Sequence, residues 1–309
     1  MNKSFTLIEI LVVIVVIGVL SAFILVGMSS VTNSANIAKG QAFANSVKNA
    51  LLINLVSEWK LDGNGNDSWG INNGSWSGSG QGYTTASWRT SSECVSGGCL
   101  AFDGLDDILT CGNNSSLWMG TRDHTVSLWV RFDTTTPTQD ETLVMCGAGD
   151  SGLGHAGYWI YRRQATSILR LCFTDGSANQ ICNDLSANAT PANNWYSVVI
   201  MFDRDATAYA YINGVKQTGY GVDIHLQNLF VQNVGVLRIG AWDGTFDRMA
   251  GKIDDVKMYH ALVSSFQINE NYFVGINKLF KNNGLALNEY NQKLVELKTN
   301  LALNKNTPN

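Results

Sequence analysis

Glu9 is the residue whose type and position carry the most chemical information in this sequence. It lies within residues 5–26, FTLIEILVVIVVIGVLSAFILV, which follow the short basic leader MNKS. About 20 apolar residues suffice to cross a membrane, and a carboxylate at that depth is costly unless an opposite charge pairs with it. The spacing therefore predicts a membrane segment in which Glu9 has a function beyond anchoring.

Six cysteines follow the apolar segment, at positions 94, 99, 111, 146, 172 and 182. In an exported domain an even number of cysteines predicts disulfides. We expect a Cys94–Cys99 bridge, because only VSGG separates the two, and a Cys172–Cys182 bridge, because the DGSAN turn would place them opposite one another in a hairpin. The alternative for each is a buried thiol. Cys111 and Cys146 stay unassigned.

An acidic stretch and a late strand together suggest a metal site. Asp62 and Asp67 enclose GNGN, which places oxygen atoms at alternate positions, as calcium loops do. In the strand GKIDDVKMY, alternation puts Asp254 on the inward face with Val256 and Met258, where a carboxylate needs donors or a cation. We therefore predict a structural Ca²⁺ held by Asp62, Asp67 and Asp254. The alternative is a turn satisfied by its own backbone.

Aromatic residues in loop-like contexts are candidate platforms for sugar rings. They are Trp69, Trp76, Trp88, Trp118, Tyr220 and Trp242. The alternative for each is packing in the core or at its rim. Glycoside hydrolases need two placed carboxylates, and the sequence has no E-x-D-x-E run and no Ser-His-Asp or metal-hydrolase motif. We therefore expect no enzymatic activity, and the identity of the ligand stays open.

The elements that must position these residues are mostly strands. A net charge of −4 and only 15% charged residues argue against a nucleic-acid surface. About a dozen segments of period two, separated by Gly, Asn and Asp turns, fall within residues 56–275 and predict a two-sheet β-sandwich. The clearest hairpin is YAYINGVKQTG, with Asn213-Gly214 at its turn.

Helices are expected at both ends of the chain. Residues 5–55 contain no proline and keep apolar or small residues at spacings of three, four and seven, which predicts a transmembrane helix continuing as a stalk. At 1.5 Å per residue, this rod would be about 75 Å long. Residues 276–309 are predicted to form an amphipathic helical tail that packs back on the sandwich or contacts a partner. Its apolar stripe comprises Leu287, Tyr290, Leu294, Leu297 and Leu301.

The N-terminus, from Lys3 to Leu20 with FTLIE at residues 5–9, resembles that of type IV pilins and of the pseudopilins of type II secretion and DNA-uptake machines. The resemblance implies a leader of residues 1–4, cleavage by a prepilin peptidase between Ser4 and Phe5, and methylation of the new N-terminus. Ser4 departs from the glycine usual before the cut. The resemblance also implies that Glu9 neutralises the terminal amine of a neighbouring subunit during filament assembly.

Residues 56–275 resemble laminin-G-like, concanavalin A-like jelly-roll domains. The segments that carry the resemblance are EWKLDGNGNDSWGINNG, CLAFDGLDDILTCGNNSSL, HTVSLWVRFD and AGKIDDVKMYHALVSSFQINENY. Such domains bind sugars or proteins, or accompany enzymes, so the resemblance indicates fold more strongly than function.

Together the two resemblances predict a pilin or pseudopilin subunit that displays a lectin-type head to glycans or surface proteins. The subunit would cross the inner membrane once before assembly and lie in a cell-surface filament with other pilin subunits afterwards. The alternatives are a membrane-anchored polysaccharide-active enzyme and a tethered adhesin that does not polymerise. No nucleic-acid partner is expected.

Overall fold

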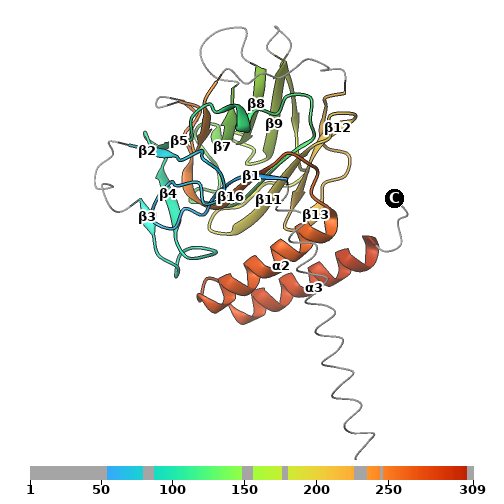
Figure 1. Cartoon of the computed structure of the whole chain (residues 1–309). Helices are drawn as coiled ribbons and strands as arrows, with labels where there is room; N and C mark the ends of the chain where they lie inside the picture. Colours follow the sequence, from blue (N-terminus) through green and yellow to red (C-terminus); the bar gives the residue numbers. More distant parts are fainter. Residues whose placement is uncertain are drawn as a thin grey trace, which may run out of the picture. The chain divides into compact units, whose positions relative to one another are not determined.

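The computed structural model describes residues 54–78, 87–147, 156–175, 180–225, 235–243 and 246–304 (Figure 1). The chain divides into two compact units, Met1–Ile53 and Asn54–Asn309. The predictions for Ser4, Phe5, Glu9 and the stalk helix fall on the first unit and lie outside the described residues. Among the helices that are described, none is long and apolar enough to cross a membrane.

The second unit is a sandwich of two antiparallel sheets, as the period-two segments predict (Figure 1). Within the described ranges, sheet A has nine strands: β1 (Leu55–Trp59), β3 (Trp88–Arg89), β4 (Cys99–Asp103), β6 (His124–Phe132), β11 (Trp195–Phe202), β12 (Thr207–Ile212), β13 (Val215–Lys216), β14 (Val222–Asp223) and β16 (Ala250–Tyr259). In the same described residues, sheet B has seven strands: β2 (Ser75–Ser77), β5 (Ile108–Thr110), β7 (Glu141–Cys146), β8 (Ala156–Arg162), β9 (Leu169–Asp175), β10 (Gln180–Asp184) and β15 (Leu237–Ile239). A short 3₁₀ helix, η1, spans Ser115–Leu117.

Strands that are neighbours in a sheet are often far apart in the sequence. Sheet A runs β13-β12-β11-β6-β16-β4-β3, with β1 also paired to β16 and β14 to β12. Sheet B runs β10-β9-β8-β7-β15-β5-β2. The first described strand therefore pairs with the last one, and the seam between β1 and β16 lies within sheet A.

The core lies between the sheets and follows from alternation along each strand. In β6, Val126, Leu128 and Val130 are fully buried in the core, while Trp129 belongs to a separate cluster on the other face. The predicted hairpin is also present: β12 and β13 are joined at Asn213 and Gly214, whose φ angles of 53° and 79° fit a two-residue turn.

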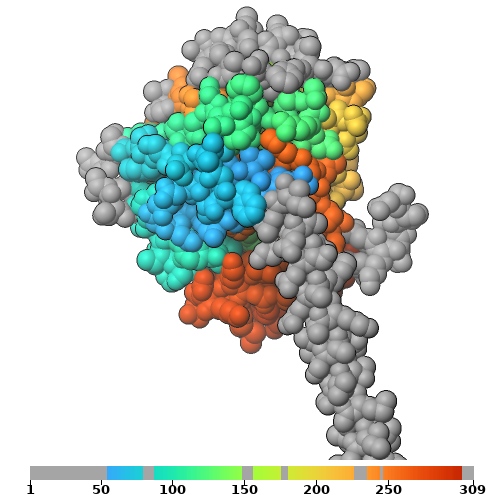
Figure 2. Space-filling view, in the orientation of Figure 1, coloured from blue at the N-terminus to red at the C-terminus, as the bar shows by residue number. Residues whose placement is uncertain are grey.

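Two helices, α2 (Ser265–Lys281) and α3 (Leu287–Asn304), cover part of the outer face of sheet A (Figure 1). Tyr272 and Ile276 of α2 join Trp129 and Trp195 of the sheet in one apolar cluster, with Leu297 of α3. Figure 2 shows the helical tail lying directly against the sandwich. The tail thus packs back on its own domain.

The helical tail begins earlier than the sequence pattern predicts. The prediction placed its start after Gly275, whereas α2 begins at Ser265. Ser264 caps the helix by accepting a hydrogen bond from the backbone N–H of Gln267, and a buried stripe starts at Ile268. The segment FQINENYF therefore belongs to the helix, because its apolar spacing of four matches a helical face better than a strand.

Candidate functional site

Both predicted cysteine pairs are disulfide-bonded in the structure. Cys94 and Cys99 have Cα atoms 5.5 Å apart and close a short loop before β4. Cys172 and Cys182 lie directly opposite one another in β9 and β10, with Cα atoms 4.1 Å apart. Cys111 and Cys146 are buried thiols. Burial raises the pKa of the Cys111 thiol well above its usual value, so it behaves as a small apolar side chain.

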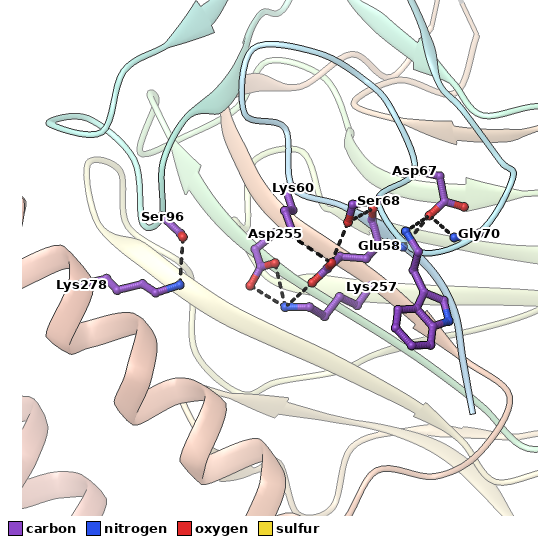
Figure 3. Close-up of polar contacts among 10 residues, drawn as sticks. Glu58, Lys60, Asp67, Ser68, Gly70, Ser96, Asp255, Lys257 and Lys278 are labelled. Atoms are coloured by element: carbon purple, nitrogen blue, oxygen red, sulfur yellow. Dashed lines mark hydrogen bonds and ion pairs between the residues drawn. The ribbon is translucent and has the colours of Figure 1, made fainter. Parts of the chain in front are cut away.

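Asp67 organises the turn that follows β1 (Figure 3). Its Oδ1 accepts hydrogen bonds from the backbone N–H groups of Glu58 at 3.0 Å, Trp69 at 3.1 Å and Gly70 at 2.8 Å. Its Oδ2 accepts one from Asn72 at 3.0 Å. Burial opposes ionisation, but these four donors outweigh it and hold the pKa of Asp67 below its usual value. Asp67 therefore fits the alternative to a metal ligand, a carboxylate whose turn is satisfied by its own backbone N–H groups.

Asp62 and Asp254 instead hold the loop that the Cys94–Cys99 disulfide closes. Asp254 Oδ2 accepts hydrogen bonds from the N–H groups of Val95 at 2.8 Å and Ser96 at 2.9 Å, and Asp62 Oδ1 accepts one from Gly98. Burial raises the pKa of Asp254 to about 8, since the two backbone donors only partly compensate for the loss of water. Asp254 is therefore a buried carboxyl group that keeps its proton near neutral pH.

Asp254 lies on the outer face of sheet A, not on the inward face that strict alternation predicts. It is paired with Trp129, which packs against α2, whereas Met258 points into the core. The register shifts just after Asp254, and Asp255 has a φ of 51°. This β-bulge inserts one residue and reverses the alternation. Asp254 is buried by the disulfide loop and not by the core.

The structure does not bring Asp62, Asp67 and Asp254 together as one ligand set. Within the described ranges, the one group of three side chains with ligand atoms within 4.8 Å of one another is Asp103, Asp106 and Asp107. Asp107 Oδ2 accepts a hydrogen bond from the N–H of Asp103 at 2.8 Å, and burial with two neighbouring carboxylates raises its pKa to about 6. Calcium binding itself stays a prediction. The run DGLDD was the signal for this group in the sequence.

Charged side chains at the seam between β1 and β16 neutralise one another (Figure 3). Lys257 Nζ donates to both carboxylate oxygens of Asp255 at 2.7 Å and lies 3.5 Å from Glu58 Oε1. Ser68 donates a hydrogen bond of 2.6 Å to Glu58 Oε2. Burial lowers the pKa of Lys257, but the charge of Asp255 outweighs burial and keeps that pKa above its usual value. These contacts link β1 to β16 across the seam.

A polar pocket of about 340 Å³ opens on the outer face of sheet A. We call it the outer pocket; it is lined by Glu93, Arg131, Asn194, Trp195, Lys252 and Glu289, together with the turn between α2 and α3. Sequence reasoning missed this site because its residues come from five separate segments. The one local signal in the sequence was a pair of polar residues, Asn193 and Asn194, directly before the aromatic residue Trp195.

The candidate sugar platforms do not gather at one place. Trp69 is 47% exposed and Tyr220 37% exposed, whereas Trp76 and Trp88 pack against the core. Trp118 is half-buried. Trp242 packs edge-on against Trp159 on sheet B, with ring centroids 4.4 Å apart. Most of these aromatic residues therefore pack as core or rim.

Comparisons with solved structures agree with the sandwich. The binding domain of Paraclostridial Mosquitocidal Protein 1 has 16% identity and a TM-score of 0.57, over 74% of this chain and 53% of that one. The receptor binding domain of the botulinum neurotoxin C/D mosaic serotype has 16% identity and a TM-score of 0.54, over 73% and 52%. This chain thus spans about half the length of those toxin domains. At this identity the likeness shows the fold alone.

Two family models match the sequence. The model of the prokaryotic N-terminal methylation motif matches residues 1–25. The model of the concanavalin A-like lectin/glucanases superfamily matches residues 103–269, which is more than half of the chain. A search of curated proteins gave no match. The chain begins with a prokaryotic N-terminal methylation motif and belongs to the concanavalin A-like lectin/glucanases superfamily.

Proposed function

We propose that this protein is a pilin-like or pseudopilin subunit whose concanavalin A-like domain is a binding head for glycans or surface proteins. The observation that carries the proposal is the presence of both family matches in one chain, with the methylation motif at residues 1–25 and the superfamily match at 103–269. The first supports processing and assembly as a pilin, and the second supports a head that binds a ligand.

Assembly follows from the physical chemistry of the N-terminal segment. Cleavage between Ser4 and Phe5 creates a positively charged amine at the start of an apolar helix. That amine and Glu9 are each costly in lipid, and pairing between neighbouring subunits relieves both costs at once. The pair would fix the axial register of the filament. Prepilin peptidase and other pilin subunits are the partners that this scheme requires.

A binding role for the head is supported by how its carboxylates are used. Asp67 accepts four backbone hydrogen bonds, and Asp255 and Glu58 are ion-paired with Lys257. A glycosidase needs two carboxyl groups facing one another across a substrate cleft. The solved toxin structures that share the fold are described as binding domains, which agrees with a head that recognises a ligand.

Mass spectrometry of the filament-bound protein tests the processing step. The mature chain is expected to begin at a methylated Phe5, because cleavage precedes the apolar run. An intact Met1 terminus would contradict the proposal.

The substitution Glu9→Val tests assembly. The variant should enter the membrane normally, because it removes a charge, and should join filaments much less efficiently than the wild-type subunit. Ser21→Val, a change of one polar residue in the same apolar segment, is the matched control and should assemble normally. Undiminished incorporation of Glu9→Val, measured beside wild-type subunits in purified filaments, would contradict the role of Glu9 in assembly. Absence of the wild-type subunit from purified filaments would favour a tethered adhesin that does not polymerise.

A further inference from the structure

The floor of the outer pocket is a row of side chains in register across three strands. In the sheet, Arg131 of β6 is paired with Lys252 of β16 on one side and with Trp195 of β11 on the other. Residues paired in this way point to the same face of a sheet. The pocket therefore has two cations side by side on a rigid base, next to a tryptophan that packs mainly in the apolar cluster with Tyr272 and Ile276.

Most of the walls of the pocket come from segments outside the residues that the superfamily model matches. Glu93 lies before residue 103, where the match begins, and the α2–α3 turn with Glu289 lies beyond residue 269, where it ends. Asn194 lies in the turn before β11. The helical tail thus converts an open sheet face into a recess of about 340 Å³, near the lower end of the about 300–1,000 Å³ typical of ligand pockets.

The charges that line the pocket are balanced. Lys252 Nζ donates to Glu93 Oε2 at 2.5 Å, and Arg131 Nη2 donates to Asn193 Oδ1 at 2.8 Å. The hydrogen bond from Lys252 holds the pKa of Glu93 below its usual value, so this carboxylate accepts hydrogen bonds at neutral pH. Among the described residues, the lining has two cations and two carboxylates. This balance disfavours a ligand of high net charge.

The ligand that matches such a lining carries many groups that both donate and accept hydrogen bonds. Hydroxyl groups do so, and Glu93, Glu289 and Asn194 offer acceptors while Arg131 and Lys252 offer donors. Trp195 at the base is 7% exposed and leaves a small apolar surface for the C–H groups of a sugar ring. We propose that the outer pocket binds one neutral hexose unit of a glycan; this inference rests on the proposed binding function of the head.

Binding of simple sugars to the full-length protein in detergent tests the inference. The probes are the methyl glycosides of glucose, galactose and mannose, with glucuronate as the charged comparison, and the measurement is calorimetric titration. At least one neutral glycoside should bind saturably and more tightly than glucuronate. Glu289→Gln and Asn194→Ala should each weaken that binding by about tenfold, as expected for one lost hydrogen bond to a charged or polar group.

Glu296→Gln is the matched control. Glu289 and Glu296 both lie on α3, and only Glu289 lines the pocket. The control should bind as the wild type does. Absence of saturable binding by every neutral glycoside, tighter binding of glucuronate, or binding unchanged in both pocket variants would each overturn the inference. None of these results depends on Phe5 or Glu9, so the filament role is judged separately by its own experiments.

Discussion

At the residue scale, two aspartates show how similar side chains reach opposite protonation states. Asp67 is 8% exposed and accepts four backbone hydrogen bonds, which keep it ionised. Asp254 is fully buried with only two backbone donors, and burial raises its pKa to about 8. The number of backbone N–H donors that the fold supplies decides whether a buried carboxyl group is ionised.

Asp254 should make the stability of the head fall as pH rises. Its carboxyl group titrates near about pH 3.9 in the unfolded chain, whereas its pKa in the folded protein is about 8. Between these values the folded state binds the extra proton, so the free energy of unfolding decreases with rising pH, by up to about 1.4 kcal/mol per pH unit from this group. Asp254→Asn removes the ionisation while its amide oxygen can still accept from Val95 and Ser96.

Urea unfolding of the wild type and Asp254→Asn from pH 5 to pH 9 provides the measurement. The variant should be more stable than the wild type near pH 8, by an amount that shrinks towards pH 5. Asp205→Asn, at an exposed loop position, is the control and should show the pH dependence of the wild type. Parallel curves for the wild type and Asp254→Asn would show that Asp254 is ionised in the folded state.

At the element scale, α2 approaches sheet A closely because Gly275 has no side chain. A Cβ atom placed there would lie 2.1 Å from the ring of Trp129. Nearby, the rings of Tyr272 and Trp129 stack with centroids 5.8 Å apart. This close packing of α2 on sheet A therefore leaves no room for a side chain at position 275.

Gly275→Ala should destabilise the head. The sign of the change in stability tells whether α2 packs closely on the sheet. In an exposed helix this change stabilises by about 1 kcal/mol, because alanine favours the helix. At Gly275 the clash with Trp129 should outweigh that gain, since overpacking a tight contact costs about 1–3 kcal/mol. Urea unfolding, followed by tryptophan fluorescence, measures the change.

The control for this variant is Val274→Ala, one residue along the same helix and 44% exposed. It should alter stability much less than Gly275→Ala does. A stabilising effect of Gly275→Ala would mean that α2 does not pack closely on the sheet in solution.

At the scale of the whole molecule, calcium would act on the stability of the entire sandwich. Binding to the folded state alone stabilises by about 2.7 kcal/mol when free metal is a hundred times the dissociation constant. For a domain of this size, each kcal/mol of stabilisation raises the melting temperature by about 2–4 °C. Thermal melts in calcium and in chelator should therefore differ by several degrees if the predicted ion binds.

Two variants locate the ion in the same experiment. The sequence places the predicted ion at Asp62, Asp67 and Asp254, whereas the structure brings together Asp103, Asp106 and Asp107. If the ion binds to this second group, Asp107→Asn should abolish the calcium-dependent shift. Asp67→Asn should lower the melting temperature in both buffers and leave the shift in place, because Asp67 is engaged by backbone donors. Identical wild-type melts in calcium and chelator would contradict the calcium prediction.

The sequence by itself determined the features that depend on local pattern. The methylation motif needs only residues 1–25, and alternation along the strands was enough to predict the sandwich. The Cys172–Cys182 and Cys94–Cys99 pairs follow from short separations, as does the turn at Asn213-Gly214. Each of these depends on neighbours within a few residues, where steric and hydrogen-bonding preferences act directly.

Only the tertiary structure decided the features that join distant segments. The bulge at Asp255 reversed the face of Asp254. Asp62 and Asp254 bind the disulfide loop, whereas Asp67 binds the turn after β1. The outer pocket required Arg131, Trp195 and Lys252 to align across three strands before the helical tail could enclose them. A one-residue shift in register moves every following side chain to the other face of a sheet, and no local pattern in the sequence specifies where that shift occurs.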